Sequence, residues 1–181
     1  MDWPTGPMFV VPRLTDICIS RITQYCTQIH HFCSMLHFRI IEYGSCDYQD
    51  MVALRDVILR KPLGLTFTPD YLQQEINDFL IGCYTKKDDT EVLIGCCILS
   101  PVDETTIQLR QMAVDQTYQG RGIGSGIISF AEQQAVQNGF TTLMMHARKT
   151  AAGFYEKLGY KIHGNEFTEV GIAHYEMMKA L

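Results

Sequence analysis

The chain has 181 residues, 46% of them hydrophobic, which is enough for a single domain with a buried core. Its formal net charge of −5, without a basic block, argues against nucleic acid as the main partner and is compatible with a cationic amine. No apolar run approaches the roughly 18 residues that a membrane span needs, so no membrane partner is expected. The seven cysteines are odd in number and contain no Cys-x-x-Cys pair, which favours reduced thiols in a cytoplasmic protein.

The first 37 residues do not fit the pattern of the rest of the chain. They lack the basic start, apolar core and cleavage site of a signal peptide, so they are interpreted as an N-terminal extension. Apolar residues at helical spacing allow a helix there. Alternatively, Met35 is the true start and the preceding residues are upstream translation. A group of possible ligands, Cys26, His30, His31 and Cys33, matches no standard zinc spacing, and no metal is expected.

A strand and a helix are predicted next. Residues 38–43 read as a strand. Ser45 or Asp47 can cap a helix that runs to about Arg60. Its apolar side is expected to carry Met51, Leu54, Val57 and Ile58.

The loop Arg60–Thr66 contains glycine and proline between two helices. It is interpreted either as a lid on the substrate side or as an ordinary connection. Thr68 followed by Pro69 predicts the start of a second helix. Residues 80–86 and 91–100 are then predicted as two antiparallel strands joined by a charged turn.

The strand predicted at residues 106–114 changes phase along its length. Ile107 and Leu109 fall at odd positions, whereas Met112 and Val114 fall at even ones. A strand that keeps one face buried changes parity only by inserting a residue, which predicts a β-bulge near Arg110 and Gln111. A strand buried on both faces is the alternative.

A glycine-rich stretch follows, Gln119-Gly120-Arg121-Gly122-Ile123-Gly124-Ser125-Gly126. Glycines remove Cβ atoms where the strand turns into a helix, so phosphates can approach the free amides of the first helical turn. Arg121 adds a fixed positive charge. The glycines match neither a dinucleotide fingerprint nor a P-loop. An anion site is therefore favoured over a tight turn without a ligand.

The rest of the chain reads as helix, strand, helix and strand. A helix is predicted from about Gly124 to Asn138. Residues 142–147 form an apolar strand, in which His146 is expected to be a hydrogen-bonded core histidine. Residues 151–160 carry Phe-Tyr before a Gly-Tyr stop, and residues 171–177 suggest a final strand.

The pattern Gln119-x-x-Gly122-x-Gly124, together with residues 151–160, resembles the GNAT superfamily of N-acetyltransferases. The loop at 60–66 and the end at 171–177 are similar to those of a bacterial ElaA-like or YjcF-like branch. The resemblance implies an α/β (α+β) GNAT fold over residues 38–181. That fold has a central mixed, mostly antiparallel sheet of six to seven strands, with splayed parallel strands 4 and 5 and about four flanking helices.

The resemblance also implies the site. Acetyl-CoA is the acyl-donor substrate, its pyrophosphate lies in the glycine-rich loop, and Tyr155 corresponds to the tyrosine that protonates the departing thiolate. Arg148 stands where the family often has an asparagine that helps to hold the pantetheine chain. It is expected to contact the coenzyme or an acidic substrate, or to face solvent. The expected coenzyme-binding residues are Met112, Ala113, Val114, Gln119, Gly120, Arg121, Gly122, Ile123, Gly124, Ser125 and Arg148.

The implied activity is acetyl transfer to a primary amine by direct attack in a ternary complex, without a metal. Backbone N–H groups around Met112 are expected to polarise the thioester carbonyl. Candidates for the base are Glu169, His174, His146 or a water chain. The acceptor is a small-molecule or peptide amine, and a homodimer is compatible with the sequence. Two alternatives stay open: an acyl-CoA-binding sensor without catalysis, and an interaction subunit with a vestigial cleft.

Overall fold

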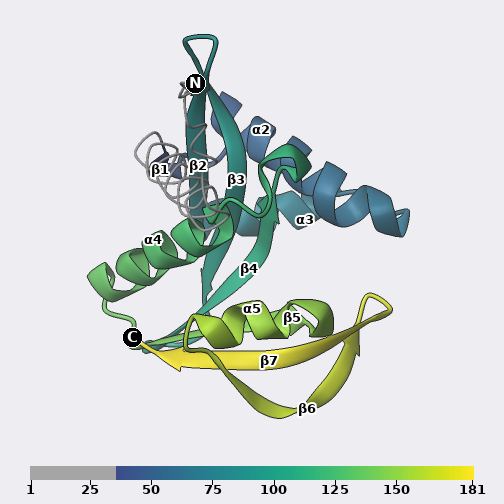
Figure 1. The fold of residues 1–181 in the computed structure, drawn as a ribbon, viewed down its shortest axis with the longest axis vertical. Coiled ribbons are helices and arrows are strands. Elements are labelled where there is room, and N and C mark those ends of the chain that lie inside the picture. Colours follow the sequence, from purple (N-terminus) through teal and green to yellow (C-terminus); the bar gives the residue numbers. More distant parts are fainter. Residues whose placement is uncertain (1–35) are drawn as a thin grey trace, which may run out of the picture. The chain divides into compact units, whose positions relative to one another are not determined.

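The structure, a computed structural model, describes residues 36–181, and Leu36–Leu181 form a unit of their own. The cysteine and histidine group at residues 26–33 and the alternative start at Met35 lie outside the described residues. Helices cover both faces of one sheet in this unit (Figure 1).

A seven-stranded mixed sheet runs through residues 36–181 in the order β1-β2-β3-β4-β5-β7-β6. All neighbouring pairs are antiparallel except β4 and β5, which confirms the predicted mixed, mostly antiparallel sheet. The strands are β1 (His37–Ile41), β2 (Phe79–Lys87), β3 (Thr90–Pro101), β4 (Thr106–Val114), β5 (Thr142–Arg148), β6 (Lys161–Glu169) and β7 (Ile172–Ala180).

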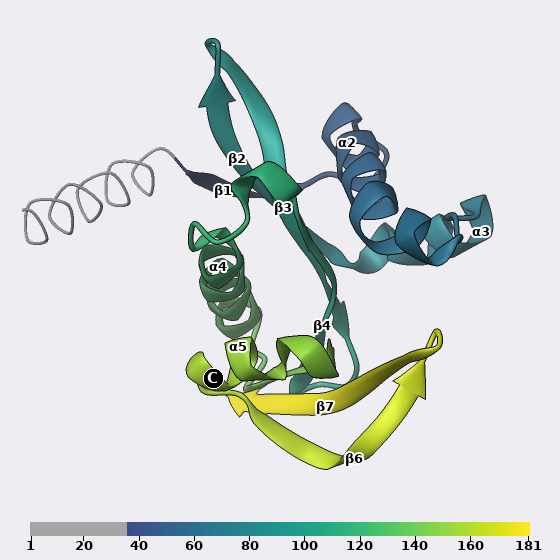
Figure 2. The same cartoon turned by 45° about the vertical axis from the view of Figure 1, so that its right-hand side comes forward.

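Four α-helices flank this sheet in the described residues: α2 (Cys46–Arg55), α3 (Pro69–Gln73), α4 (Ile123–Gln137) and α5 (Ala152–Lys157). Helices α2 and α3 lie on one face and α4 on the other, as the turned view shows (Figure 2). Ser45 caps α2, because its side chain accepts a hydrogen bond from Tyr48 N, and Thr68 caps α3 in the same way through Tyr71 N. Both caps follow the sequence prediction.

The chain after α2 departs from the predicted regular helix. It continues as a π-helix, Asp56–Arg60, and then as a short 3₁₀ turn, Lys61–Leu63. A π-helical turn holds more residues than an α-helical one, so it changes which side chains face the core. The prediction that Val57 shares the buried face was therefore wrong: Val57 is 49% exposed, whereas Met51 is fully buried.

Strand β4 contains the predicted β-bulge. Cys96 pairs with Ala113 and Ile98 pairs with Arg110, so one residue of β3 faces two residues of β4. Gln111, the first of those two, has a φ of +49°, in the left-handed region that residues with a Cβ rarely adopt. The bulge turns the strand just before the segment that leads into the glycine-rich loop.

Strands β4 and β5 separate after a short parallel contact. Residues 106–109 align with residues 142–145, and the rest of β5 pairs only with β7. The predicted splaying of strands 4 and 5 is confirmed. Within the described residues, the second half of β4 therefore has no strand on its β5 side.

Two strands follow α5 where the element order in the sequence suggested one. Strand β6 forms the edge of the sheet, and nearly all its side chains are exposed, so it lacks the apolar alternation that marks a half-buried strand. Strand β7 lies between β5 and β6 and carries the buried residues His174 and Met177. The hairpin of β6 and β7 turns at Val170 and Gly171, both with positive φ.

Candidate active site

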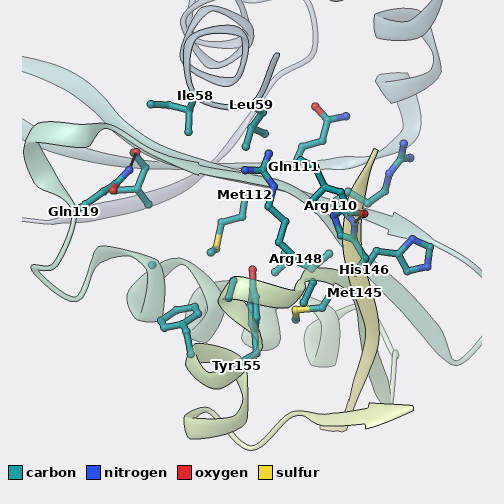
Figure 3. Close-up of a pocket in the computed structure, with 18 of the residues that line it drawn as sticks. Ile58, Leu59, Arg110, Gln111, Met112, Gln119, Met145, His146, Arg148 and Tyr155 are labelled. Carbon is teal, nitrogen blue, oxygen red and sulfur yellow. Dashed lines mark hydrogen bonds between the residues drawn. The ribbon is translucent and has the colours of Figure 1, made fainter. Parts of the chain in front are cut away.

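A cavity of about 740 Å³ opens where β4 and β5 separate. Figure 3 shows Gln119 at one end, Arg110 and His146 at the other, and Tyr155 below the middle. The lining includes most of the predicted site residues: Met112, Val114, Gln119, Gly120, Gly122, Ile123, Gly124, Ser125, Arg148, Tyr155, Glu169 and His174. The fold thus gathers residues from β4, α4, β5, α5 and the β6–β7 hairpin.

The turn into α4 requires two of the glycines for their backbone conformation. Gly120 and Gly122 have φ values of +75° and +82°, and a Cβ at either would meet no atom within 4 Å. Gly122 is the N-cap of α4, so the amides of the first turn have no partner within the helix. No acidic side chain lies in that first turn. This end of the cavity therefore presents N–H donors and the positive end of a helix dipole, which suit a phosphate group.

The other two glycines serve packing. A Cβ on Gly126 would lie 2.7 Å from Phe38 Cζ, and one on Gly124 would lie 3.3 Å from Phe154 Cζ. Phe38 itself stacks on Phe130, with ring centroids 5.8 Å apart. The interpretation of all four glycines as positions for ligand approach is therefore wrong for Gly126, which lets α4 lie close to β1.

The backbone of β4 presents polar groups to the cavity. Asp115 N donates to Ile94 O of β3 at 2.9 Å, and successive residues of a strand direct their backbone groups to opposite edges. Asp115 therefore directs its backbone groups toward β3. Met112 and Val114 alternate with it, so their N–H and C=O groups point to the opposite edge, where β5 has separated. Val114 O accepts a hydrogen bond there from Gln119 Nε2 at 2.9 Å. The remaining groups can bind an extended ligand as a further strand would.

Tyr155 of α5 lies beneath this edge. Its side chain is 7% exposed, and its ring packs against Phe154 and Tyr160 at centroid distances of 5.0 and 6.1 Å. The hydroxyl points into the cavity, toward Met112 and Arg148 (Figure 3). Burial raises the pKa of the Tyr155 phenol to about 12. The phenol is therefore neutral at ordinary pH and can donate a hydrogen bond.

His174 of β7 is also buried, with 8% exposed. Its Nδ1 lies 2.8 Å from Ile172 O. Because a carbonyl oxygen only accepts, Nδ1 carries the proton in the neutral ring and Nε2 keeps a lone pair. The ring stacks on Phe167, and the residue lies opposite Arg148 of β5. His174 can therefore accept a proton at the cavity.

His146 corrects a prediction. Leu143, Met145 and Ala147 are buried, so the alternation of β5 places His146 on the opposite face, where it is exposed and lines the cavity. Its Nδ1 lies 3.0 Å from Glu169 Oε2, at the start of the hairpin turn. The expectation of a core histidine was wrong. It followed from the apolar residues before His146 and did not take account of the alternation of side chains between the two faces of the strand.

Of three further residues predicted to bind the coenzyme, Arg148, Ala113 and Arg121, only Arg148 lines the cavity. Arg148 lines the cavity near its middle (Figure 3). The Ala113 side chain is buried in the core on the α2 side of the sheet, and the residue is not among those that line the cavity. Arg121 is exposed and lies outside the lining, with its guanidinium carbon 5.6 Å from the centre of the Tyr118 ring.

A buried polar network that the sequence did not predict lies behind the cavity. Arg55 is fully buried and donates to both oxygens of Glu75, at 2.8 and 2.9 Å. The same guanidinium donates to Gln111 Oε1 at 3.0 Å, and Gln111 Nε2 donates to the Tyr71 hydroxyl at 2.7 Å. Tyr48 completes it by donating to Glu75 Oε2 at 2.8 Å. An arginine in a helix has no pattern that predicts burial, since most arginines are exposed.

Comparisons with known proteins agree with this geometry. Residues 81–162 match the family model described as an acetyltransferase (GNAT) domain. The uncharacterized N-acetyltransferase YitI of Bacillus subtilis (strain 168) is 32% identical over 145 residues, which cover 77% of this chain and 95% of YitI. The chain therefore belongs to the GNAT superfamily of acetyltransferases. Its place in the ElaA-like or YjcF-like branch stays a prediction.

Solved structures share the fold. A putative N-acetyltransferase from Lactobacillus plantarum has a TM-score of 0.71 at 22% identity, covering 81% of this chain and 98% of that one. A GNAT family acetyltransferase from Elizabethkingia anophelis with acetyl-CoA bound has a TM-score of 0.61 at 18% identity, covering 81% and 99%. Among the curated relatives, several match only over part of their length. The matched part of this chain covers about half the length of each of these relatives, between 39% and 52%.

Residues 36–181 include no helix with the length and apolar character to cross a bilayer. In the same residues, no three histidine, cysteine, aspartate or glutamate side chains are grouped so that they could hold a metal ion. Cys83, Cys96 and Cys97 are buried, and burial raises the pKa of the Cys96 thiol to about 12.

Proposed function

We propose that this protein transfers an acetyl group from acetyl-CoA to a primary amine, with both substrates bound at once in the cavity. The observation that carries the proposal is the position of Tyr155 beneath the gap between β4 and β5. In that gap, the backbone groups of Met112 and Val114 face the same space as the phenol. A small-molecule or peptide amine would enter from the end marked by Arg110 and His146.

Acetyl-CoA fits the donor side in two respects. The amides at residues 122–125, with the positive end of the α4 dipole, suit its diphosphate. The free edge of β4 suits an extended arm that carries amide groups, because Met112 and Val114 offer alternating donors and acceptors. These contacts would hold the thioester near the bulge.

In the proposed reaction, the neutral amine attacks the thioester carbonyl carbon, so that a C–N bond forms and the C–S bond breaks. The N–H of Met112 donates to the carbonyl oxygen while negative charge develops there, an interaction typically worth about 3 kcal/mol. Tyr155 donates its proton to the departing sulfur. A phenol is a weaker acid than a thiol, so the proton moves only as the C–S bond breaks. The proton that the amine gives to the base then returns to the Tyr155 phenolate through solvent, so the products are an amide and the neutral thiol of coenzyme A.

His174 is the preferred acceptor of the amine proton. Its Nδ1 proton is committed to Ile172 O, which leaves Nε2 to accept. The exposed pair of His146 and Glu169 is the second candidate, acting through a water molecule. His174 is preferred because it is buried, with 8% of the residue exposed, whereas His146 is exposed.

The test is thiol release from acetyl-CoA, measured over a panel of amines. The Tyr155→Phe variant keeps the ring and removes the acidic proton, so turnover should fall by about one to three orders of magnitude while acetyl-CoA affinity is kept. Tyr43→Phe is the matched control, since Tyr43 packs on the core outside the cavity lining.

The two alternatives predict different results. A sensor without catalysis binds acetyl-CoA in calorimetry, releases no thiol with any amine, and is indifferent to Tyr155→Phe. An interaction subunit with a vestigial cleft does not bind acetyl-CoA. Turnover that is unchanged in Tyr155→Phe would remove the acid role and leave the transferase.

A further inference from the structure

The end of the cavity opposite the glycine-rich loop has a surplus of hydrogen-bond donors that acetyl transfer alone leaves unexplained. We propose that Arg60, Arg110 and Tyr71 form a subsite for a carboxylate there. The acceptor is then an amine that also carries a carboxylate, as an amino acid does. This inference rests on the proposed transfer and names the acceptor class for the same site.

Tyr71 brings two guanidinium groups together. Arg110 Nη2 donates to the Tyr71 hydroxyl at 3.2 Å, and the guanidinium carbon of Arg60 lies 5.0 Å from the centre of the Tyr71 ring. Arg60 ends the π-helix and Arg110 comes from β4, so the chain brings them to one ring from distant positions. Two like charges at one ring repel each other, and a bound oxyanion would turn that repulsion into attraction.

The Tyr71 hydroxyl has its own proton left to donate. It accepts hydrogen bonds from Gln111 Nε2 at 2.7 Å and from Arg110 Nη2 at 3.2 Å, and neither of these groups can accept in return. The orientation of the Gln111 amide is fixed, because its Oε1 accepts from Arg55 at 3.0 Å. Within residues 36–181, these two accepted bonds are the hydrogen bonds that the Tyr71 hydroxyl forms. That proton is available to a ligand.

The cavity lining carries a positive charge although the whole chain carries −5. Arg60, Arg110 and Arg148 line the cavity, and none of them forms an ion pair within the described residues. Of the lining residues, only Glu169 carries a carboxylate, and it lies 3.0 Å from the His146 ring. Three cations against one carboxylate favour an anionic ligand.

Both hydrogen-bond partners of Arg110 are neutral hydroxyl groups. Its second hydrogen bond goes to Ser100 Oγ at 3.3 Å, a neutral partner. Asp78 lies outside the cavity lining and interacts electrostatically with Arg110 without forming an ion pair, while burial raises the pKa of that carboxyl. A carboxylate from the cavity side can therefore complete the coordination of Arg110.

Apolar residues beside the subsite define the rest of the acceptor. Ile58 and Leu59 project into the cavity from the π-helix (Figure 3), and Leu63 of the following turn lines it as well. An acceptor with an apolar side chain next to its carboxylate would contact both kinds of surface. Small apolar amino acids have this form.

The experiment compares kcat/KM for amino acids with that for their amides, using leucine with leucinamide and methionine with methioninamide. Each pair shares the amine and the side chain and differs in the carboxylate. We expect the acids to be better acceptors by about tenfold to a hundredfold, the range for a charged hydrogen bond. Phosphoethanolamine and taurine test other anions, and a preference for either over the amino acids would overturn the assignment of a carboxylate.

The variants locate the effect. Arg60→Gln should lower kcat/KM for the acids by about tenfold and leave the amides and the acetyl-CoA affinity unchanged. Tyr71→Phe keeps the ring and removes the hydroxyl proton, so it should change the acids in the same direction. Lys86→Gln removes one positive charge from an exposed position outside the lining and should change neither class. Equal losses for acids and amides in Arg60→Gln would overturn the subsite.

The outcomes separate this inference from the proposed function. Turnover of uncharged amines without preference for acids contradicts the subsite and keeps the transferase. If no amine releases thiol, the transfer fails. Calorimetric titration of leucine and leucinamide into the wild-type and Arg60→Gln proteins then decides the subsite. The subsite is supported if the wild-type protein binds leucine but not leucinamide and Arg60→Gln binds neither. Any other result overturns the subsite.

Discussion

The guanidinium of Arg55 holds the side chain of Gln111, the left-handed residue of the β4 bulge, through a hydrogen bond of 3.0 Å from Nη1 to Oε1. The backbone conformation of Gln111 costs about 1–2 kcal/mol for a residue with a Cβ. A hydrogen-bonded side chain helps to keep it there. Because the same guanidinium is paired with Glu75, the wall of the cavity depends on an ion pair buried under α2.

Arg55→Met should lower the free energy of unfolding by about 3–5 kcal/mol, because it leaves the Glu75 carboxylate buried without its cation. Urea unfolding measures the change. The double variant Arg55→Met/Glu75→Leu should recover much of the loss, since it removes both charges. Arg39→Met, which breaks exposed ion pairs with Asp47 and Glu91, should cost less than about 1 kcal/mol. A single variant no less stable than this control would contradict burial of the pair.

Gly122→Ala should weaken acetyl-CoA binding by about tenfold, because a Cβ disfavours the φ of +82° that aims the first amides of α4 at the cavity. Gly44→Ala is the matched control. Gly44 has a φ of +79° and the same open space around its Cβ position, but it lies outside the lining. Both should lose similar stability in thermal unfolding, and only Gly122→Ala should lose affinity in calorimetry. Equal affinities would argue against ligand binding by this turn.

Gly126→Ala should reduce stability and leave the acetyl-CoA affinity of the folded protein unchanged. The new Cβ would lie 2.7 Å from Phe38 Cζ, so the ring must move away from its stack on Phe130. Adding Phe38→Leu should restore part of the stability. Thermal unfolding and calorimetry check the two halves of the prediction. A loss of affinity as large as in Gly122→Ala would return Gly126 to the binding loop.

Turnover at saturating substrates should not fall between about pH 8 and pH 10. Burial raises the pKa of Tyr155 from 10.0 to about 12, so the phenol keeps its proton in that range. The unfolded chain ionises this group at about pH 10, so its contribution to stability is present below that pH and is lost as the pH rises toward 12. The check is kcat against pH for wild type and Tyr155→Phe. A falling limb below pH 10 that Tyr155→Phe abolishes would contradict the raised pKa.

His174→Gln should lower kcat/KM for the amine by about one to two orders of magnitude at neutral pH, because the amide has no basic nitrogen to replace Nε2. His146→Gln should have little effect, since that ring is exposed and paired with Glu169. Both proteins should bind acetyl-CoA as wild type does. The opposite ranking in kcat/KM would move the base to the pair of His146 and Glu169.

Sequence patterns predicted the parts of the site that depend on local backbone geometry. The change of phase along residues 106–114 predicted a bulge near Arg110 and Gln111, because only an inserted residue can change the parity of a half-buried strand, and the structure has the bulge there. The glycines at 120 and 122 predicted the turn into α4, since their left-handed conformation excludes most other residues. Ser45 and Thr68 predicted two helix starts through their cap bonds.

The features that the sequence did not predict depend on contacts between distant residues. The pair of Arg55 and Glu75 is separated by 20 residues, and neither has neighbours that would predict burial. The π-helix at residues 56–60 moved Val57 to the surface, and no residue in it is a helix breaker. The edge strand β6 has exposed side chains throughout most of its length, so its pairing with β7 rather than its periodicity makes it a strand.

A crystal structure of the protein with coenzyme A would show whether the turn into α4 binds the diphosphate. We expect the diphosphate oxygens to accept hydrogen bonds from the amides at residues 122–125, within about 3.2 Å, and the sulfur to lie beside the Tyr155 hydroxyl. A diphosphate bound elsewhere, or an α4 turn filled by side chains in the complex, would contradict it.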